Sequence, residues 1–251
     1  MGEHLFRSSI KRRLFVGFSY KPEINELKRQ PLNEKIGGLV GILGRHHPSS
    51  LAHSFEVALT AVTLASELNL NTEVVKEIFV GSLLHDIGKT GVPVEILDRK
   101  DTLTTAQTAK LILHGRLGAA IMKRVGLADL AYFCDEHHIG NSNNHSWTEE
   151  ELAKRHPLTE IITLSDLICA ALDPRRPYHS PEQLEALIPD IEAKEKTGIF
   201  SKNLVSAFKM AMSSRFLFPP YTSQIYHESE LFMRLVNEFG LNRSLSERIF
   251  L

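Results

Sequence analysis

The chain has 251 residues, of which 43% are hydrophobic and 24% charged, so it can bury one large core and is not expected to be disordered. A formal net charge of −1 provides no global field that would draw nucleic acid. The two cysteines, Cys134 and Cys169, have no paired spacing, which argues against a disulfide framework or a thiolate zinc site and fits a reducing cytoplasm. Since no apolar run approaches the roughly 18 residues needed to span a bilayer, we expect a cytoplasmic protein with no membrane or nucleic-acid partner.

Residues 1–45 are predicted to form a basic arm, because they carry nine Lys and Arg against four Asp and Glu. Basic and aromatic residues interleave up to residue 35, a pattern that could bind nucleic acid or a partner but is more typical of a solvated arm. The segment 37–44 holds four glycines whose spacing matches no phosphate-binding loop. We interpret it as a flexible or closely packed connection.

Apolar residues at helical spacing predict a helix from about Ser50 to Leu68. His53 lies in its first turn, and its neighbours one turn away are Ser49 and Val57, so the imidazole points along the buried face. Taken alone, a histidine in that place is more often a core or capping residue than a ligand.

A second helix is predicted from Thr72 to about Asp86, with Asn71 as its cap. Gly81 and Ser82 lie one turn beneath His85, which predicts open space under the imidazole. Adjacent side chains on a helix point about 100° apart, so His85 and Asp86 can converge only where the helix ends. Gly88 is interpreted as the residue that stops it.

Three histidines further along the chain have two interpretations each. His114 could cap a helix C-terminus, where a protonated imidazole is favourable, or act as a ligand. His137 and His138 precede Gly140 and several asparagines, so the pair could be a wet helix end or could face a metal and a substrate.

Asp166 lies in the almost wholly apolar segment 158–172 and is therefore expected to be buried. An isolated buried charge is expensive. A metal ion would explain it, and a salt bridge to Lys89 or Arg176 is the alternative.

The remaining elements are also predicted as helices. Thr148 begins a capping box for a short helix that ends near Pro157, and further helices are predicted over 180–193, 201–213 and 222–251. The last stretch has apolar residues at helical intervals that could serve the core or a dimer surface. Because no segment shows a convincing period of two, the predicted fold class is all-α.

Residues 83–89, Leu-Leu-His-Asp-Ile-Gly-Lys, resemble the His-Asp signature of the HD phosphohydrolase superfamily, and residues 90–97 resemble its HD-GYP branch, which hydrolyses cyclic di-GMP. The resemblance extends over about residues 46–210, and the matching positions occur in the family's order: His53, His114, His137, His138, Asp166, Arg176 and Tyr178. It implies an all-α HD bundle of five core helices plus further helices over residues 46–215, with a helical extension over 216–251 packed on it.

Two departures from the family pattern limit what the resemblance implies. The tripeptide Gly-Tyr-Pro that names the branch is absent after His138. Ser49 stands where members with three metals have a glutamate. Because a hydroxyl is a poor substitute for a bridging carboxylate, we expect two metals.

The resemblance implies a binuclear site whose ligands are His53, His85, Asp86, His114, His137, His138 and Asp166. In our interpretation Asp86 bridges the ions; His53, His85 and Asp166 complete one, and His114 with His137 or His138 completes the other. Imidazole and carboxylate ligands without thiolate suit two divalent transition-metal ions, iron or manganese first and zinc or nickel as alternatives. Lys89, Arg176 and Tyr178 are the candidate substrate-binding residues, with Asp86 and Lys89 as the catalytic ones.

Such a site predicts a metal-dependent phosphodiesterase in which a metal-bridged hydroxide attacks a cyclic dinucleotide, cyclic di-GMP first. One alternative is an HD phosphohydrolase for another nucleotide or phosphoester, because the altered loop leaves guanine recognition unsupported. A catalytically inactive receptor for a nucleotide or a signalling protein is a second alternative, and a homodimer is left open.

Overall fold

The computed structural model describes residues 22–139, 148–173, 184–213 and 223–249, and every regular element in these ranges is a helix. The predicted all-α class is therefore confirmed. The first elements in chain order are α2 (Pro22–Leu27), α3 (Leu32–His46), α4 (Pro48–Glu67), α5 (Thr72–Leu84), η1 (Ile87–Gly91), α6 (Val94–Leu97), α7 (Thr105–Ile112), α8 (His114–Arg124), η2 (Ala128–Leu130) and α9 (Ala131–Glu136). They are followed by α10 (Glu149–Ala153), α11 (Thr159–Leu172), η3 (Leu184–Leu187), α12 (Ile188–Lys196), α13 (Lys202–Ala211), α14 (Ser223–Glu228), α15 (Glu230–Glu238) and α16 (Asn242–Ile249).

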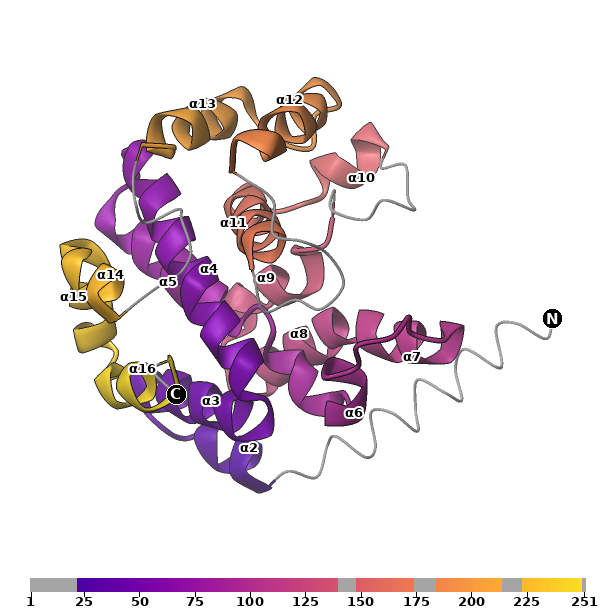
Figure 1. Cartoon of the computed structure of the whole chain (residues 1–251). Helices are drawn as coiled ribbons and strands as arrows, with labels where there is room; N and C mark the ends of the chain where they lie inside the picture. Colours follow the sequence, from indigo (N-terminus) through magenta and orange to yellow (C-terminus); the bar gives the residue numbers. More distant parts are fainter. Residues whose placement is uncertain (1–21, 140–147, 174–183, 214–222, 250–251) are drawn as a thin grey trace.

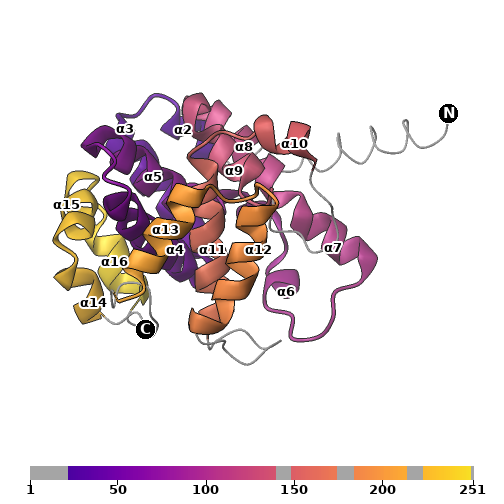
Figure 2. The same ribbon diagram turned by 90° about the horizontal axis from the view of Figure 1, so that it is seen from above.

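The helix α4 is the centre of the molecule, and α3, α5, α11 and α13 all pack against it (Figure 1). It is buried continuously from Ser50 to Ala65. A helix without a solvent-exposed face lies inside a core rather than on a surface, which agrees with the low content of charged residues in α4, where only Glu56 and Glu67 are acidic and no lysine or arginine occurs. Figure 2 places α14, α15 and α16 on one side of this centre and α7 on the opposite side.

The predicted caps are found where the helices begin. Asn71 accepts a hydrogen bond from the backbone N–H of Val74 at 3.0 Å and so satisfies an end group of α5. Thr148 and Glu151 form the predicted capping box of α10. The segment predicted as one helix over 180–193 instead contains η3 and then α12, and residues 174–183 lie outside the described residues.

The glycine-rich segment 37–44 is helical, so its interpretation as a connection was wrong. It lies inside α3, whose Ile36, Leu39, Val40 and Leu43 are buried in the same core as α4. A Cβ on Gly38 would lie 2.4 Å from the side chain of Leu27 in α2. Tertiary packing outweighs the weak helix propensity of glycine here. The division of the chain at residue 45 stays a prediction, but α3 packs into the core on the far side of that boundary.

The C-terminal helices pack onto the core through the apolar residues expected to do so. Phe232, Leu235 and Val236 of α15 are buried, and the ring of Phe232 meets that of Phe79 in α5 at a centroid distance of 5.6 Å. The alternative of a dimer surface stays untested. Within the described ranges no helix is both long and apolar enough to cross a membrane.

Both cysteines are buried thiols, and we predict that they resist alkylation in the folded chain. Burial raises the pKa of Cys134, with the charges of Asp86 and Asp135 adding to the effect, and the thiolate is the reactive form. Titration with a thiol reagent is expected to label neither cysteine until denaturant unfolds the chain. Rapid labelling of Cys134 under native conditions would contradict the packing described above.

Candidate metal centre

The end of α5 brings His85 and Asp86 together. The helix stops at Leu84, and Asp86 has φ −99° and ψ 8° before the chain tightens into η1. This change in backbone conformation lets the adjacent side chains of His85 and Asp86 face one site, as expected where a helix ends. The helix ends at Leu84, four residues before Gly88, and the φ of Gly88 is not positive, so the interpretation of Gly88 as the residue that stops the helix was wrong.

The expected open space beneath His85 is filled. A Cβ on Gly81 would lie 2.3 Å from the ring of Phe133, which belongs to α9. Glycine at position 81 therefore lets an aromatic ring pack against α5, and Ser82 is fully buried there as well. The predicted space is therefore occupied by the side chain of Phe133 and is not available to a ligand.

Asp86 lies at the middle of the site, and its two oxygens face different groups. Oδ1 lies 3.2 Å from Nε2 of His114 and 3.9 Å from Nε2 of His137. Oδ2 lies 3.4 Å from Nε2 of His85 and 2.5 Å from Nζ of Lys89. Burial alone would raise its pKa, but Lys89 and His85 hold the pKa of Asp86 well below its usual value. A carboxylate with one oxygen toward each side is suited to bridge two cations.

One ligand group consists of His53, His85 and Asp86, which are all buried and whose ligand atoms lie within 4.8 Å of one another. Asp166, which α11 supplies, accepts a hydrogen bond from Nε2 of His53 at 2.8 Å. The partner of Asp166 is thus an imidazole, whereas the ammonium of Lys89 binds Asp86. Burial opposes ionisation of Asp166, but His53 outweighs it and holds the pKa of this carboxyl well below its usual value.

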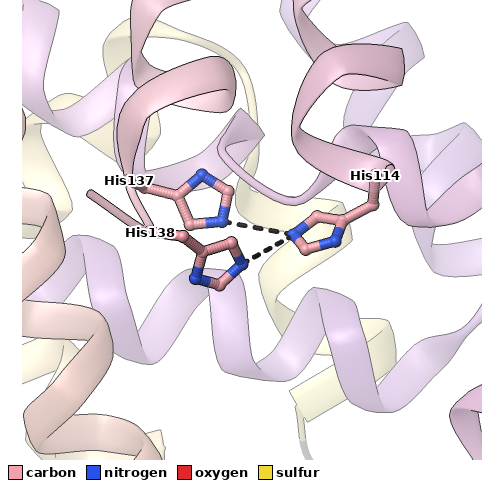
Figure 3. A group of neighbouring side chains, drawn as sticks. All are labelled: His114, His137 and His138. Atoms are coloured by element: carbon pink, nitrogen blue, oxygen red, sulfur yellow. Dashed lines mark hydrogen bonds between the residues drawn. The ribbon is translucent and has the colours of Figure 1, made fainter. Parts of the chain in front are cut away.

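The second ligand group is formed by His114, His137 and His138, shown in Figure 3. His114 is the first residue of α8 and not the C-cap of α7, which is Leu113, but its ring hydrogen-bonds the carbonyl of Leu111 in the last turn of α7. His137 and His138 directly follow α9. The Nε2 atom of His114 lies 3.2 Å from Nε2 of His137 and 3.1 Å from Nε2 of His138. His137 is buried and His138 is exposed. The interpretation as a solvated helix end therefore applies to His138 but not to His137.

Backbone carbonyls fix the orientation of three of these rings. Nδ1 of His85 lies 2.6 Å from the carbonyl oxygen of Ser82, Nδ1 of His114 lies 2.5 Å from that of Leu111, and Nδ1 of His137 lies 2.8 Å from that of Cys134. A carbonyl only accepts, so each Nδ1 carries the proton and each Nε2 of a neutral ring presents a lone pair to the site. This orientation by a backbone acceptor is typical of metal-binding histidines.

The resulting site is crowded with acceptors, and this fits a bound cation. Nε2 of His114 and of His137 face each other at 3.2 Å, with Asp86 Oδ1 beside them, and none of the three holds a proton when the rings are neutral. Burial lowers the pKa of His137 well below its usual value, which keeps this ring neutral. A separation of 3.2 Å suits neighbouring ligands with metal bonds of about 2.1 Å.

Two more observations agree with this fit. Nε2 of His85 is buried and makes no hydrogen bond, as expected of an atom placed to bind a cation. The charge of Asp86 outweighs burial and raises the pKa of this ring, so metal binding would displace the proton that Asp86 favours. Burial of the ring lowers the pKa of His138 to about 4, although the residue as a whole is exposed. Neutral imidazoles are the form that binds metal.

The structure brings together the seven predicted ligands and Lys89 but does not describe the rest of the predicted site. Arg176 and Tyr178 lie outside the described residues, as does the segment 140–147 in the place of the lost tripeptide. The carbonyls of Ser82, Leu111 and Cys134, which orient three of the rings, were not predicted from the sequence. Each lies three residues before its histidine, so this spacing at helix ends was the available signal.

Comparisons with known proteins give the family of the region that contains this site. Residues 50–173 match the family described as HD domain, and all seven predicted ligands lie within that match. This region of the chain is an HD domain. HD phosphohydrolases bind divalent metals, and the two ligand groups above are positioned for that role.

Three relatives that this chain resembles are named as two phosphodiesterases and a ribonuclease. The chain is 28% identical over 162 residues to a cyclic di-GMP phosphodiesterase of Thermotoga maritima, covering 62% of this chain and 43% of the relative. It is 26% identical over 193 residues to a 3′3′-cGAMP-specific phosphodiesterase of Vibrio cholerae, covering 75% and 40%. It is 30% identical over 158 residues to a ribonuclease Y of Pseudothermotoga lettingae, covering 63% and 25%. The chain therefore spans less than half the length of each of these relatives.

We predict that metal binding stabilises the folded chain, because the ligands converge only when the helices are packed. A metal at 100 times its Kd stabilises by about 2.7 kcal/mol, which corresponds to a rise in Tm of roughly 5–10 °C for a domain of this size. Thermal unfolding of metal-free chain with added Mn²⁺, Fe²⁺, Zn²⁺ or Ni²⁺ measures this, and a chelator should reverse the shift. An unchanged Tm with all four ions would contradict the site.

Proposed function

We propose that this HD domain chain is a metal-dependent phosphodiesterase that hydrolyses a cyclic dinucleotide, with cyclic di-GMP as the first candidate. The proposal is carried by Asp86, whose two oxygens face the two ligand groups from a buried position. These groups would hold two divalent ions, which would supply activation of a water molecule and positive charge opposite the phosphate.

The residues of the chain would divide the remaining work. Asp86 would serve both ions, His53 and His85 with Asp166 would hold the first, and His114 with His137 or His138 the second. Lys89 is 19% exposed at its side chain and now binds Asp86. Once cations neutralise that carboxylate, its ammonium is available to bind an anionic phosphate oxygen.

The substrate class is supported by the names of the relatives, two of which act on cyclic dinucleotides. The second candidate is another phosphodiester, and the absence of Gly-Tyr-Pro together with the similarity to a ribonuclease favours it. A receptor that binds without hydrolysis is the third, and the complete ligand set argues against it.

The test uses the purified full chain with its metal content measured. Cyclic di-GMP, 3′3′-cGAMP, a short single-stranded RNA and bis(p-nitrophenyl) phosphate would be incubated with chain loaded with Mn²⁺ or Fe²⁺. Cleavage of the cyclic dinucleotides in preference to RNA supports the first candidate, and the reverse order selects the second. Tight binding of cyclic di-GMP without products would select the receptor.

A further inference from the structure

His137 and His138 lie beyond the end of α9, so the hydrogen bonds of this helix alone do not fix their positions. His137 and His138 follow the last residue of α9, and the described backbone ends one residue later, at Ile139. The ring of His137 is oriented by a carbonyl of its own helix. The ring of His138 contacts His114 and His137 instead, at centroid distances of 4.9 and 4.0 Å.

Glu136, the residue before the histidine pair, forms hydrogen bonds with residues at and just before the start of α11. Its Oε2 accepts a hydrogen bond from the backbone N–H of His156 at 2.8 Å and another from the hydroxyl of Thr159 at 3.1 Å. The helix α11 carries Asp166, so one carboxylate links the histidine pair to the helix that serves the other ligand group.

Arg155 binds the residue after the pair. One end of its guanidinium donates to the carbonyl of Ile139 at 3.3 Å and the other to the carbonyl of Ile199 at 2.5 Å. Glu160 lies 3.7 Å from it, and the side chain of Arg155 is only 7% exposed. Glu160 in turn accepts from the backbone and hydroxyl of Ser201 at the start of α13. A buried arginine is costly unless its donors are satisfied, and two of these donors are used on backbone carbonyls.

We infer that Glu136 and Arg155 are positioning residues, which hold the turn of His137 and His138 from its two ends so that this pair can bind a metal with His114. The inference rests on the proposed two-metal site. The two residues touch no ligand atom themselves. They fix the backbone on each side of the pair, and the guanidinium does so with the fork geometry that a lysine lacks. Residues that orient metal ligands commonly change metal affinity 10- to 100-fold when they are replaced.

The structure offers a matched pair of variants at position 136. Glu136→Gln keeps a side-chain oxygen that accepts from His156 and Thr159, whereas Glu136→Ala removes both hydrogen bonds. Arg155→Ala removes the bonds to Ile139 and Ile199, and Lys154→Ala, at a side chain 71% exposed, is its control. If these residues only supported the fold, their loss would lower the Tm of the metal-free chain without changing metal affinity.

The experiment titrates metal-free full-length chain with Co²⁺ and follows both the bound equivalents and the visible absorption, which reports the ligand geometry. Wild type, Glu136→Gln and Lys154→Ala are expected to bind two equivalents with the same spectrum. Glu136→Ala and Arg155→Ala are expected to bind the first normally and the second 10- to 100-fold more weakly, with an altered band.

The outcomes separate this inference from the proposed function. A second equivalent that binds to folded Glu136→Ala with wild-type affinity and spectrum overturns the positioning inference alone. A wild-type chain that binds fewer than two equivalents overturns the two-metal site and the positioning inference with it. If Arg155→Ala does not fold, the comparison of Glu136→Ala with Glu136→Gln decides.

Discussion

Asp86→Asn is expected to lower the rate of phosphodiester cleavage by about 10³-fold or more, which corresponds to about 4 kcal/mol of lost transition-state stabilisation. The amide keeps the size of the carboxylate but loses its charge and its ability to serve a cation on each side. Because Oδ1 faces His114 and His137 while Oδ2 faces His85, the change acts on both ligand groups at once. The measurement is kcat/KM with metal-loaded chain, beside metal analysis of the same samples.

The matched control for this change is Asp129→Asn, because Asp129 is exposed in η2. It removes the same charge from the chain and is expected to leave both the rate and the metal content unchanged. Circular dichroism should show that Asp86→Asn is folded. If this variant cleaves the substrate at the wild-type rate, Asp86 is not the bridge and the proposed mechanism fails.

Three of the candidate ligands could be singled out from the sequence because their chemistry is local. His85 and Asp86 stand at the end of a helical pattern, and Asp166 is an acid in an apolar helix. Each of these polar residues lies in a segment whose other residues are mostly apolar. Burying a charged side chain without a partner is costly, so such a residue can be recognised without a structure. The resemblance to the HD family then put these residues, with His53 and His114, into one site.

Contacts between helices could not be predicted in the same way. Periodicity gives the face of a helix but not the distance to its neighbour. The sequence around Gly81 predicted open space, but Phe133 packs there. The segment that contains Gly38 was interpreted as a flexible or closely packed connection, but Gly38 lies in a helix and lets Leu27 approach α3. Glu136 and Arg155 were not predicted as part of the site, because most of their partners are backbone groups that only the fold brings near.

Gly88 is the position where such a contact matters most for the site. A Cβ there would lie 1.8 Å from the carbonyl oxygen of His114 and 2.5 Å from the backbone nitrogen of Gly118. Both atoms belong to α8, so η1 and α8 touch through their backbones. No side-chain rotation relieves a clash with backbone atoms, so either the two elements separate or the chain does not fold.

Gly88→Ala is therefore expected to destabilise the metal-free chain by about 3 kcal/mol or more, at the upper end of overpacking effects. In any chain that still folds, α8 must shift, and this moves His114 away from Asp86, whose Oδ1 is now 3.2 Å from its Nε2. Metal affinity should fall together with stability. Urea unfolding and metal titration of the same variant measure the two effects.

Gly37→Ala is the matched control, because it is expected to change the stability in the opposite direction. Gly37 is also inside a helix, α3, but a Cβ there meets nothing within 4 Å. The added methyl group should stabilise the chain by about 0.5–1 kcal/mol, since alanine loses less backbone entropy in a helix than glycine does. Opposite changes at residues 37 and 88 would show that the contact between η1 and α8, rather than a general intolerance of alanine, requires glycine beside the metal centre. Equal stability of the two variants would contradict the close approach of His114 to Gly88.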